Sequence, residues 1–301
     1  MVDITEKDRS LRYAKAQATV KVSKEETIRA IVDKTVPKGD VLEFAKVAGL
    51  FAVKKTAELI PDCHPIPVEY THITYQVEAM HIHIFVEVKT IYRTGVEVEA
   101  MHGASVVALT MYDMLKPIDK GIEIQNIRLL EKTGGKSDTK TSPKIFKACL
   151  LIYSDGVASG RKANKITEPL KGILLKHQIE ITQVTIMEEK MQYLEEFLHN
   201  IATLPFELVL VAGGTGITPK DLVPTTLQKY FEVSANSLMA AARSYGLERD
   251  FKAMLSEGVA GLIGKRLVVN IPGSEQGALD TMRPIAKGIR KILENNNYSK
   301  D

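Results

Sequence analysis

A polar stretch near the middle of the chain separates two halves whose hydrophobic patterns differ, which limits the chain to folds with two domains. Residues 132–144, KTGGKSDTKTSPK, are rich in Gly, Ser, Thr and Lys, a composition typical of a connection between domains. A chain of 301 residues is long enough for two domains of ordinary size. We therefore expect one domain over residues 1–138, a linker over 139–144 and a second domain over 145–301.

Composition excludes several classes of partner. Hydrophobic residues make up 45% of the chain, so both halves can bury a core, and a net charge of +3 is too small to indicate nucleic acid or a membrane. No apolar run approaches the roughly 20 residues that cross a bilayer, and the start, MVDITEKDRS, lacks the apolar stretch of a signal peptide. We expect a cytoplasmic protein. Its two cysteines, Cys63 and Cys149, supply no disulfide framework and no four-thiolate zinc site.

The first half mixes helical and strand-like segments without strict alternation. Ser23 and Glu26 form a capping-box pattern that predicts the start of a helix. Aliphatic residues at every second position of 82–88 indicate a strand. Three further segments are a helix over 40–60 that ends at Pro61, a helix over 104–116 that stops at Pro117, and a strand over 122–130. This order favours an α+β domain with an antiparallel sheet.

The second half is regular. Four apolar runs, FKACLLIYSD, IEITQVTI, FELVLVAGG and KRLVVNIPGS, are each followed by a helix-like segment. Strands that are buried on both faces and alternate with helices are typical of a parallel sheet covered on both sides. We expect a three-layer α/β domain with a mostly parallel sheet.

Several charged groups in the first half stand where structure alone does not require them. His64 follows Cys63 between two prolines, which restrict the backbone of this loop. Lys38 lies in the turn PKGD before a helix. Asp113 and Lys116 are three residues apart in the last turn of an expected helix and therefore share a face.

Two further pairs complete this set. Glu97 and Glu99, in TGVEVEA, are two apart at a strand-like end and are expected to point the same way. Lys132 and Lys136 bracket a Gly-Gly pair, where backbone N–H groups and two ammonium groups could cradle an anion.

Each of these features also has a purely structural explanation. Asp113 with Lys116 fits a solvated helix pair, the Lys-Gly-Gly-Lys loop fits a flexible linker, and His64 fits a structural loop histidine. His81 and His83 share a strand face and, with Cys63, could suggest a metal-dependent hydrolase, although no coherent ligand set is apparent.

Taken in order, the motifs resemble one family. LIPDCHPIP, KGDVLEFAKVAGLFAVKKTAELIP, TGVEVEA, YDMLK and RLLEKTGGKS, within residues 1–138, are similar to the cyclic pyranopterin monophosphate synthase (MoaC) family of molybdenum cofactor biosynthesis. The resemblance implies an α+β ferredoxin-like fold and a homo-hexamer with active sites between subunits. It also implies conversion, without a cofactor, of the GTP-derived 3′,8-cyclo-7,8-dihydroguanosine triphosphate to cyclic pyranopterin monophosphate and pyrophosphate. The departures are Asp62 before Cys-His-Pro and His102–Gly103 after the glutamates.

The resemblance also implies residue roles. The implied catalytic residues are Lys38, His64, Glu97, Asp113, Lys116 and Lys132, and the implied substrate contacts are Asp3, Arg12, Cys63, Glu99 and Lys136. The chemistry suits these types, because proton transfers need lysines whose pKa is lowered by clustered cations and a triphosphate needs several cations. In this interpretation Asp113 holds Lys116, and Cys63 is a packed neighbour of His64 rather than a nucleophile.

In the second half, polar or glycine-rich residues follow three of the expected strands. They are Ser154–Asp155, AGGTGITPKD over 212–221, and NIPGS over 270–274. Ligands of open α/β sheets bind at the carboxyl ends of strands, and glycines before a helix let the backbone approach a phosphate. The glycine turn is not a Walker loop, and alone it fits a plain strand–helix turn equally well.

Together these segments resemble the molybdopterin adenylyltransferase (MogA/MoaB) family over about residues 145–295. That family is a trimeric α/β protein that uses ATP and Mg²⁺ to adenylylate molybdopterin. The resemblance implies nucleotide or pterin contacts at Ser154, Asp155, Glu188, Gly213, Gly214, Thr215, Gly216, Asp221, Gly273 and Ser274, with Asp221 as a Mg²⁺ ligand.

Three departures leave the second activity open. An Asp-Lys-x-x-Pro segment is replaced by Asn164-Lys165-Ile166-Thr167-Glu168, and Pro-Asp-Glu is replaced by Met187-Glu188-Glu189. A Ser-Arg pair becomes Ser256–Glu257, which puts an anion near a phosphate position. The alternatives are adenylyl transfer, a degenerate binding or assembly module, and a nucleotide-binding scaffold without catalysis over the whole chain.

Overall fold

The structure, a computed structural model, describes residues 1–135 and 144–298. It divides into two compact units, residues 1–140 and residues 141–301. Lys136 and all but the last residue of the expected linker over 139–144 lie outside the described residues. Within the described ranges, no helix is both long and apolar enough to cross a membrane.

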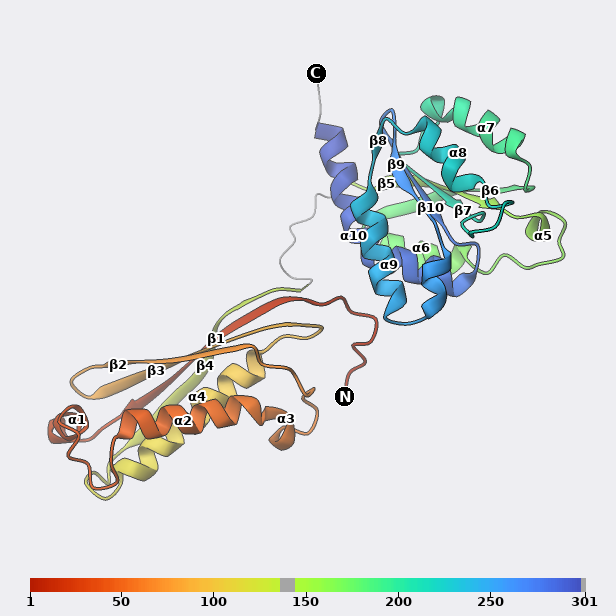
Figure 1. The fold of residues 1–301 in the computed structure, drawn as a ribbon. Helices are drawn as coiled ribbons and strands as arrows, with labels where there is room; N and C mark the ends of the chain where they lie inside the picture. The colour runs from red at the N-terminus through yellow and green to blue at the C-terminus, as the bar shows by residue number, and fades with distance from the viewer. Residues whose placement is uncertain (136–143, 299–301) are drawn as a thin grey trace. The chain divides into compact units, whose positions relative to one another are not determined.

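The first unit is a four-stranded antiparallel sheet with helices on one face (Figure 1). Its sheet order is β2-β3-β1-β4, and each neighbouring pair is antiparallel. This βαββαβ arrangement confirms the predicted α+β, ferredoxin-like fold. The elements are β1 (Ser10–Lys21), α1 (Glu25–Val32), α2 (Val41–Lys54), α3 (Thr56–Leu59), β2 (Tyr70–Val77), β3 (His81–Tyr92), α4 (Glu97–Leu115) and β4 (Glu123–Thr133).

One face of this sheet packs against α2 and α4, and every second residue of its central strands is buried there. The even-numbered residues of β1 from Ala14 to Val20 and of β3 from Ile82 to Val88 are fully buried. Small residues let the two helices approach closely, because a Cβ at Gly103 would lie 2.6 Å from a methyl group of Val53. Gly103 is therefore required by helix packing. Figure 1 draws α2 and α4 side by side on the sheet.

Three local predictions for this unit were incomplete or wrong. The strands over 10–21 and 70–77 were not predicted, because their alternation is weak. The capping box at Ser23 is wrong, since Lys24 precedes the helix and makes no side-chain cap. The Ser23 hydroxyl donates instead to Asp119, which joins the start of α1 to the segment after α4.

Asp119 anchors this corner and is 1% exposed. It accepts hydrogen bonds from the N–H of Ser23 at 2.8 Å, the hydroxyl of Thr27 at 3.0 Å and the N–H of Gly121 at 3.0 Å. Burial alone would raise the pKa of Asp119, but these hydrogen bonds outweigh it and lower the pKa to about 2. Because the folded pKa lies below the unfolded one, the stabilisation is present above about pH 4 and is lost as the pH falls toward 2.

We expect Asp119→Ala to lower the free energy of unfolding of the first unit by about 2–4 kcal/mol at pH 7, since buried donors lose a charged acceptor. The loss should be smaller at pH 3. Urea unfolding of the full chain at both pH values measures it, with the exposed Asp33→Ala as the matched control. A loss at pH 7 no larger than that of Asp33→Ala would contradict the anchoring role.

The second unit is a six-stranded sheet of order β6-β5-β7-β10-β9-β8. The first four strands are parallel, and β9 and β8 are antiparallel additions. Its elements are β5 (Phe146–Tyr153), α5 (Asp155–Ala158), α6 (Thr167–Leu175), β6 (Ile179–Met187), α7 (Met191–His199), β7 (Leu208–Ala212), α8 (Val223–Tyr230), β8 (Val233–Ser234), α9 (Asn236–Leu247), β9 (Ala260–Ile263), β10 (Arg266–Ile271) and α10 (Glu275–Tyr298).

Helices cover both faces of this sheet, which confirms the predicted three-layer domain. One core packs the sheet against α6, α9 and α10, and a second core packs its other face against α7 and α8. The expectation that all four strands are buried on both faces is wrong for β6. This strand lies at the sheet edge, and Ile186 is 48% exposed.

Candidate active sites

The carboxyl end of α4 holds a carboxylate between two ammonium groups. Lys38 Nζ lies 2.7 Å from Asp113 Oδ2 and donates to Asp113 O at 2.9 Å, and Lys116 Nζ lies 2.7 Å from Asp113 Oδ1. Asp113 is in the last turn of α4, Lys116 is its C-cap, and Lys38 precedes α2. The structure therefore brings together three sequence-predicted residues, which we call the Lys38–Asp113–Lys116 group.

The opposite charges of Asp113 and Lys116 each favour the ionised form of the other side chain. Hydrogen bonds from Lys116 and Lys38 lower the pKa of Asp113 to about 2. The hydrogen bond to Asp113 in turn raises the pKa of Lys116. The expectation that clustered cations lower the pKa of Lys116 is therefore wrong within one chain. At neutral pH Lys116 can bind an anion or donate a proton, but it is a poor base.

The amino end of α4 holds a second group around Glu97. Lys132 Nζ on β4 lies 3.3 Å from Glu97 Oε1. Gly134 and Gly135 have positive φ angles of 98° and 94°, and a Cβ at Gly134 would lie 3.1 Å from Cδ of Arg12. The Arg12 side chain thus packs on this glycine turn next to Lys132, and its Nε donates to Tyr92 O at 3.3 Å.

Glu97 and Glu99 do not lie on a strand, and the prediction that they point the same way is wrong. Both lie in the first turn of α4, where residues two apart face different directions. Glu99 is 2% exposed, and its Oε2 has no hydrogen-bond partner among the described residues. Burial raises the pKa of Glu99. Glu97, in contrast, faces Lys132.

Cys63 and His64 reach the same end of α4 from their loop. Cys63 Sγ donates to Glu99 Oε1 at 3.3 Å, and burial followed by this bond raises the pKa of Cys63 to about 11. Such a thiol is a poor nucleophile at neutral pH. His64 and Glu99 line a cavity of about 130 Å³. His64 Nε2 lies 2.8 Å from Val2 O, next to Asp3, whose carboxylate accepts hydrogen bonds from Thr5.

One chain does not assemble all of these residues into one site. Glu97 and Asp113 lie near opposite ends of α4. They are 16 positions apart, and a helix rises 1.5 Å per residue, so about 24 Å separates them along the helix axis. The predicted set therefore forms the Lys38–Asp113–Lys116 group at one end and an amino-end group at the other (Arg12, Cys63, His64, Glu97, Glu99 and Lys132).

The histidines of β3 do not join either group. His81 and His83 stack with ring centroids 6.1 Å apart. His83 Nδ1 lies 3.1 Å from Thr19 Oγ1, and His83 Nε2 lies 3.6 Å from Glu78. Among the described residues, no group of three His, Cys, Asp or Glu side chains is placed to hold a metal.

In the second unit, glycine-rich strand ends meet at one edge of the sheet. Gly213 and Gly214 have φ angles of 123° and 60°, and a Cβ at Gly213 would collide with the carbonyl of Tyr153. A Cβ at Gly273 would lie 3.4 Å from Gly213 Cα. The ends of β5, β7 and β10 are thus in close contact, as predicted. The glycine turn does not open a helix directly, since α8 begins only at Val223.

Asp221 folds back across this loop. Its Oδ2 accepts hydrogen bonds from the hydroxyl of Thr218 at 2.5 Å and the N–H of Thr218 at 3.1 Å, and the first of these chiefly lowers the pKa of Asp221. Thr215, in the same loop, is 7% exposed. Mg²⁺ commonly binds one or two carboxylates together with substrate phosphates, so an ionised Asp221 beside a glycine loop fits such an ion.

The acidic residues after β6 separate into two roles. Glu189, not Glu188, faces Asp155: the Glu189 N–H donates to Asp155 Oδ1 at 2.8 Å, and the Asp155 N–H donates to Glu189 Oε1 at 3.3 Å. Glu188 pairs with Lys190 at 2.5 Å. Sequence reasoning missed Glu189, although it is adjacent to a predicted residue.

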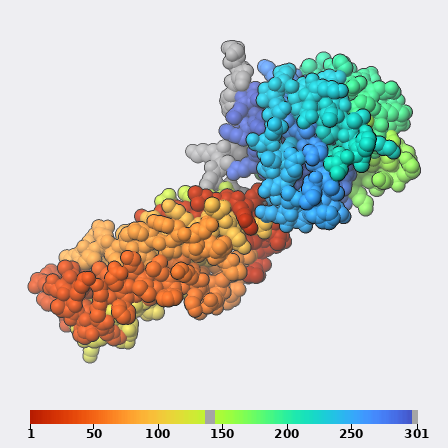
Figure 2. Space-filling model, in the orientation of Figure 1, coloured from red at the N-terminus to blue at the C-terminus, as the bar shows by residue number. Residues whose placement is uncertain are grey.

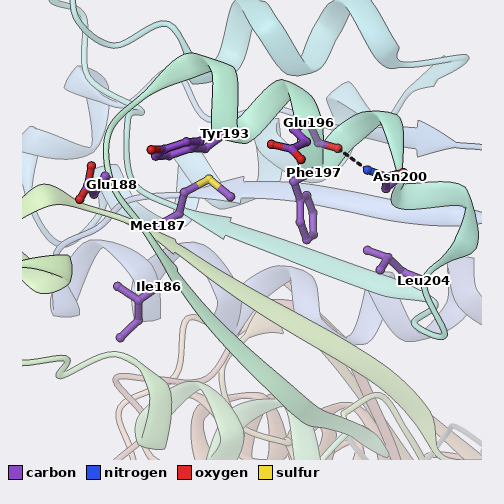
Figure 3. Close-up of a pocket in the computed structure, with 8 residues that line it drawn as sticks. All are labelled: Ile186, Met187, Glu188, Tyr193, Glu196, Phe197, Asn200 and Leu204. Carbon is purple, nitrogen blue, oxygen red and sulfur yellow. Dashed lines mark hydrogen bonds between the residues drawn. The ribbon is translucent and has the colours of Figure 1, made fainter.

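Glu188 instead borders an open groove of about 500 Å³ between β6 and α7. Figure 3 shows Met187, Tyr193 and Phe197 lining this groove, with Glu196 accepting a hydrogen bond from Asn200 through its backbone carbonyl. Ser154 and Ser274 remain at the ends of their strands, where their backbone groups bond to Met187 and Ala278.

Two of the sequence departures acquire structural roles. Asn164 Oδ1 accepts hydrogen bonds from the N–H groups of Ile166 and Thr167, each at 3.3 Å, so this neutral side chain contacts the backbone where α6 begins. The N–H of Glu257 donates to Thr215 O at 2.7 Å, and its carboxylate lies 3.6 Å from a guanidinium nitrogen of Arg243. Arg243 thus supplies a cation close to the place where the sequence shows a charge reversal.

Two family models match separate parts of the chain. The model of the MoaC family matches residues 1–135, and a model described as a probable molybdopterin binding domain matches residues 149–291. A molybdenum cofactor biosynthesis bifunctional protein of Chlorobaculum tepidum is 34% identical over 289 residues, covering 96% of this chain and 92% of the relative.

Two further relatives match the whole chain and the first unit. A molybdenum cofactor biosynthesis bifunctional protein of Synechococcus elongatus is 28% identical, covering 98% of this chain and 97% of the relative. A cyclic pyranopterin monophosphate synthase of Listeria monocytogenes is 47% identical over 140 residues, covering 46% of this chain and 87% of the relative.

Proposed function

Since the chain belongs to the family of bifunctional molybdenum cofactor biosynthesis proteins, we propose that its two units hold separate pterin sites for two steps of that synthesis. The first unit is a cyclic pyranopterin monophosphate synthase. It converts the GTP-derived 3′,8-cyclo-7,8-dihydroguanosine triphosphate to cyclic pyranopterin monophosphate and pyrophosphate. The Lys38–Asp113–Lys116 group is the observation that carries the residue roles proposed below.

The two groups on α4 divide the work of this reaction. Lys132 and Arg12 oppose the triphosphate charge, and one ammonium–phosphate pair at 4 Å contributes about 1 kcal/mol in water and about 4 kcal/mol in a partly dry site. Asp113 holds Lys38 and Lys116 in place, and Lys116 donates protons to the substrate. Glu99, whose pKa is raised by burial, lines the cavity beside His64 and is placed to exchange a proton with a substrate bound there.

Product analysis tests this assignment directly. The full chain, mixed with the GTP-derived cyclic triphosphate, should release cyclic pyranopterin monophosphate and an equal amount of pyrophosphate. A folded protein that forms neither product would overturn the role of the first unit.

We further propose that two copies of the chain complete each first-unit site, within a homo-hexamer. About 24 Å along α4 is too far for one pterin triphosphate to contact both groups, whereas two α4 helices related by a twofold axis place the opposite ends together. The outer face of α2 carries Phe44, Val47 and Phe51, each at least 51% exposed, and Leu109 on α4 is 59% exposed. Figure 2 shows the orange surface of α2 lying open along the first unit. Such apolar faces suit contact with a second copy.

For the second unit we propose binding of a nucleotide and molybdopterin at the glycine loops, with Mg²⁺ at Asp221 and adenylyl transfer as the reaction. The ends of β5, β7 and β10 meet closely at Gly213 and Gly273, at the sheet edge where ligands of open α/β sheets bind, and Asp155 follows β5 at this edge. The second candidate is a binding or assembly module without transfer. It is favoured by the neutral Asn164 and by the anionic Glu257 beside the loop. In either case we propose that the protein acts in the cytoplasm on small molecules.

Asp221→Asn separates these candidates. If the second unit transfers AMP, this variant should lower the yield of adenylylated molybdopterin from ATP and Mg²⁺ by about a hundredfold or more, because the metal loses its carboxylate. Thr218→Val removes the hydroxyl that orients Asp221 and should lower the yield about tenfold. Chromatography of the reaction products measures both. A wild-type chain that binds molybdopterin but forms no adenylylated product would contradict adenylyl transfer and support the binding or assembly role.

A further inference from the structure

The segment Ser256–Gly258 is fixed against the glycine loop by its backbone. The N–H of Glu257 donates to Thr215 O at 2.7 Å, and a Cβ at Gly258 would lie only 2.6 Å from the carbonyl oxygen of Asn270. Thr215 follows β7, and Asn270 lies near the end of β10. Glu257 therefore stands at the sheet edge where ligands of open α/β sheets bind.

Arg243 brings a guanidinium group to the same place from α9. Its Nη1 lies 3.6 Å from Glu257 Oε2 and 3.5 Å from Ser256 O. The Arg243 and Glu257 side chains are 40% and 61% exposed. An ion pair this long and exposed is weak, so little holds Arg243 to Glu257 when a stronger anion is present.

We propose that Arg243 receives a phosphate of the ligand at the second-unit site, and that Glu257 occupies this cation as a built-in competitor when the site is empty. The inference rests on the proposed function of this site. A phosphate carries more charge than a carboxylate and matches the guanidinium fork with two parallel hydrogen bonds, so it displaces Glu257. The Glu257 carboxylate then weakens binding without abolishing it, because the Arg243 guanidinium group on α9 can still bind the phosphate.

Two ligands could bring this phosphate: the nucleotide and molybdopterin. Calorimetric titration of the full chain with ATP and Mg²⁺ in one arm, and with molybdopterin in the other, identifies which one contacts Arg243. The first unit is unchanged in every variant, so differences between variants report on the second unit.

We expect Glu257→Gln to tighten binding of the contacting ligand about fivefold at low salt, the scale of a weak exposed ion pair. Arg243→Gln should weaken that binding about tenfold or more, as expected for loss of a charge-assisted phosphate contact. The double variant should bind like Arg243→Gln alone, because Glu257 acts only through Arg243. The gain from Glu257→Gln should shrink as salt screens the exposed charges.

Glu180→Gln is the matched control, since it removes the same charge from an exposed position at the amino end of β6. The inference is overturned if Glu257→Gln leaves both affinities unchanged, or if the double variant keeps the gain. It is also overturned if wild type and Glu257→Gln both fail to bind either ligand.

Failure of this inference can be distinguished from failure of the proposed transfer reaction. A second unit that binds more tightly after Glu257→Gln but yields no adenylylated product supports the inference and contradicts adenylyl transfer. Product formation that depends on Asp221 but is insensitive to substitution of both Arg243 and Glu257 supports adenylyl transfer and contradicts the inference about Arg243.

Discussion

Replacing Asp113 with asparagine is expected to lower the rate of cyclic pyranopterin monophosphate formation by about a thousandfold, on the scale of losing positioned acid–base and electrostatic groups. Asp113 contacts both Lys38 and Lys116 at 2.7 Å. An amide of the same size carries no charge, so it cannot hold two ammonium groups together. Both lysines would then sample other rotamers, and the substrate would lose an oriented anion contact and a proton donor.

The Asp113→Asn protein should remain folded, which separates this effect from loss of structure. The Asp113 side chain is 55% exposed, and surface substitutions of this kind change stability little. Single-turnover assays and thermal unfolding of the same preparation measure the two properties, with Asp33→Asn as the exposed control. Because the pKa of Asp113 is about 2, its ionisation should not limit the wild-type rate anywhere above about pH 4.

Lys116→Met tests the same group from the other side. Its pKa is raised by Asp113, so we assign it proton donation and anion binding rather than base catalysis. A near-wild-type rate for Lys116→Met would remove Lys116 from the mechanism, and the Asp113→Asn effect would then have to act through Lys38.

Sequence patterns predicted elements better than contacts between elements. The alternation over 82–88 and the apolar runs after residue 145 identified strands, because burial on one or both faces imposes those patterns. The motif TGVEVEA was misleading. Its period-two pattern resembles a strand, but α4 begins at Glu97, where packing against the sheet and α2 overrides the local pattern.

The first-unit site was only partly predictable for the same reason. Spacing predicted that Asp113 and Lys116 share one helical face, and their contact in the structure confirms this. That Glu97 and Asp113 lie at opposite ends of one helix follows only once α4 is seen to be continuous. Spacing also cannot show that Arg243 faces Glu257, because 14 positions and a change of element separate them.

The largest recovery of activity is expected from mixing two inactive variants. If one site combines the Lys38–Asp113–Lys116 group of one copy with the amino-end group of another, Asp113→Asn and Glu97→Gln damage opposite halves of the site. A mixed dimer then contains one doubly damaged site and one intact site. Random pairing of the two chains should restore about a quarter of the wild-type rate, because half of the dimers are mixed.

A matched pair of variants controls for nonspecific recovery. Asp113→Asn and Lys116→Met damage the same half of the site, so their mixed dimers contain no intact site and should stay inactive. Each pair is co-expressed with two different affinity tags, and sequential purification isolates oligomers that contain both chains.

Pyrophosphate and cyclic pyranopterin monophosphate released by these mixed oligomers, at equal protein concentration, test the two-chain active site most directly. We predict substantial product from Asp113→Asn with Glu97→Gln and none above background from Asp113→Asn with Lys116→Met. Mixed oligomers of the first pair that remain as inactive as either variant alone would contradict a site shared between copies.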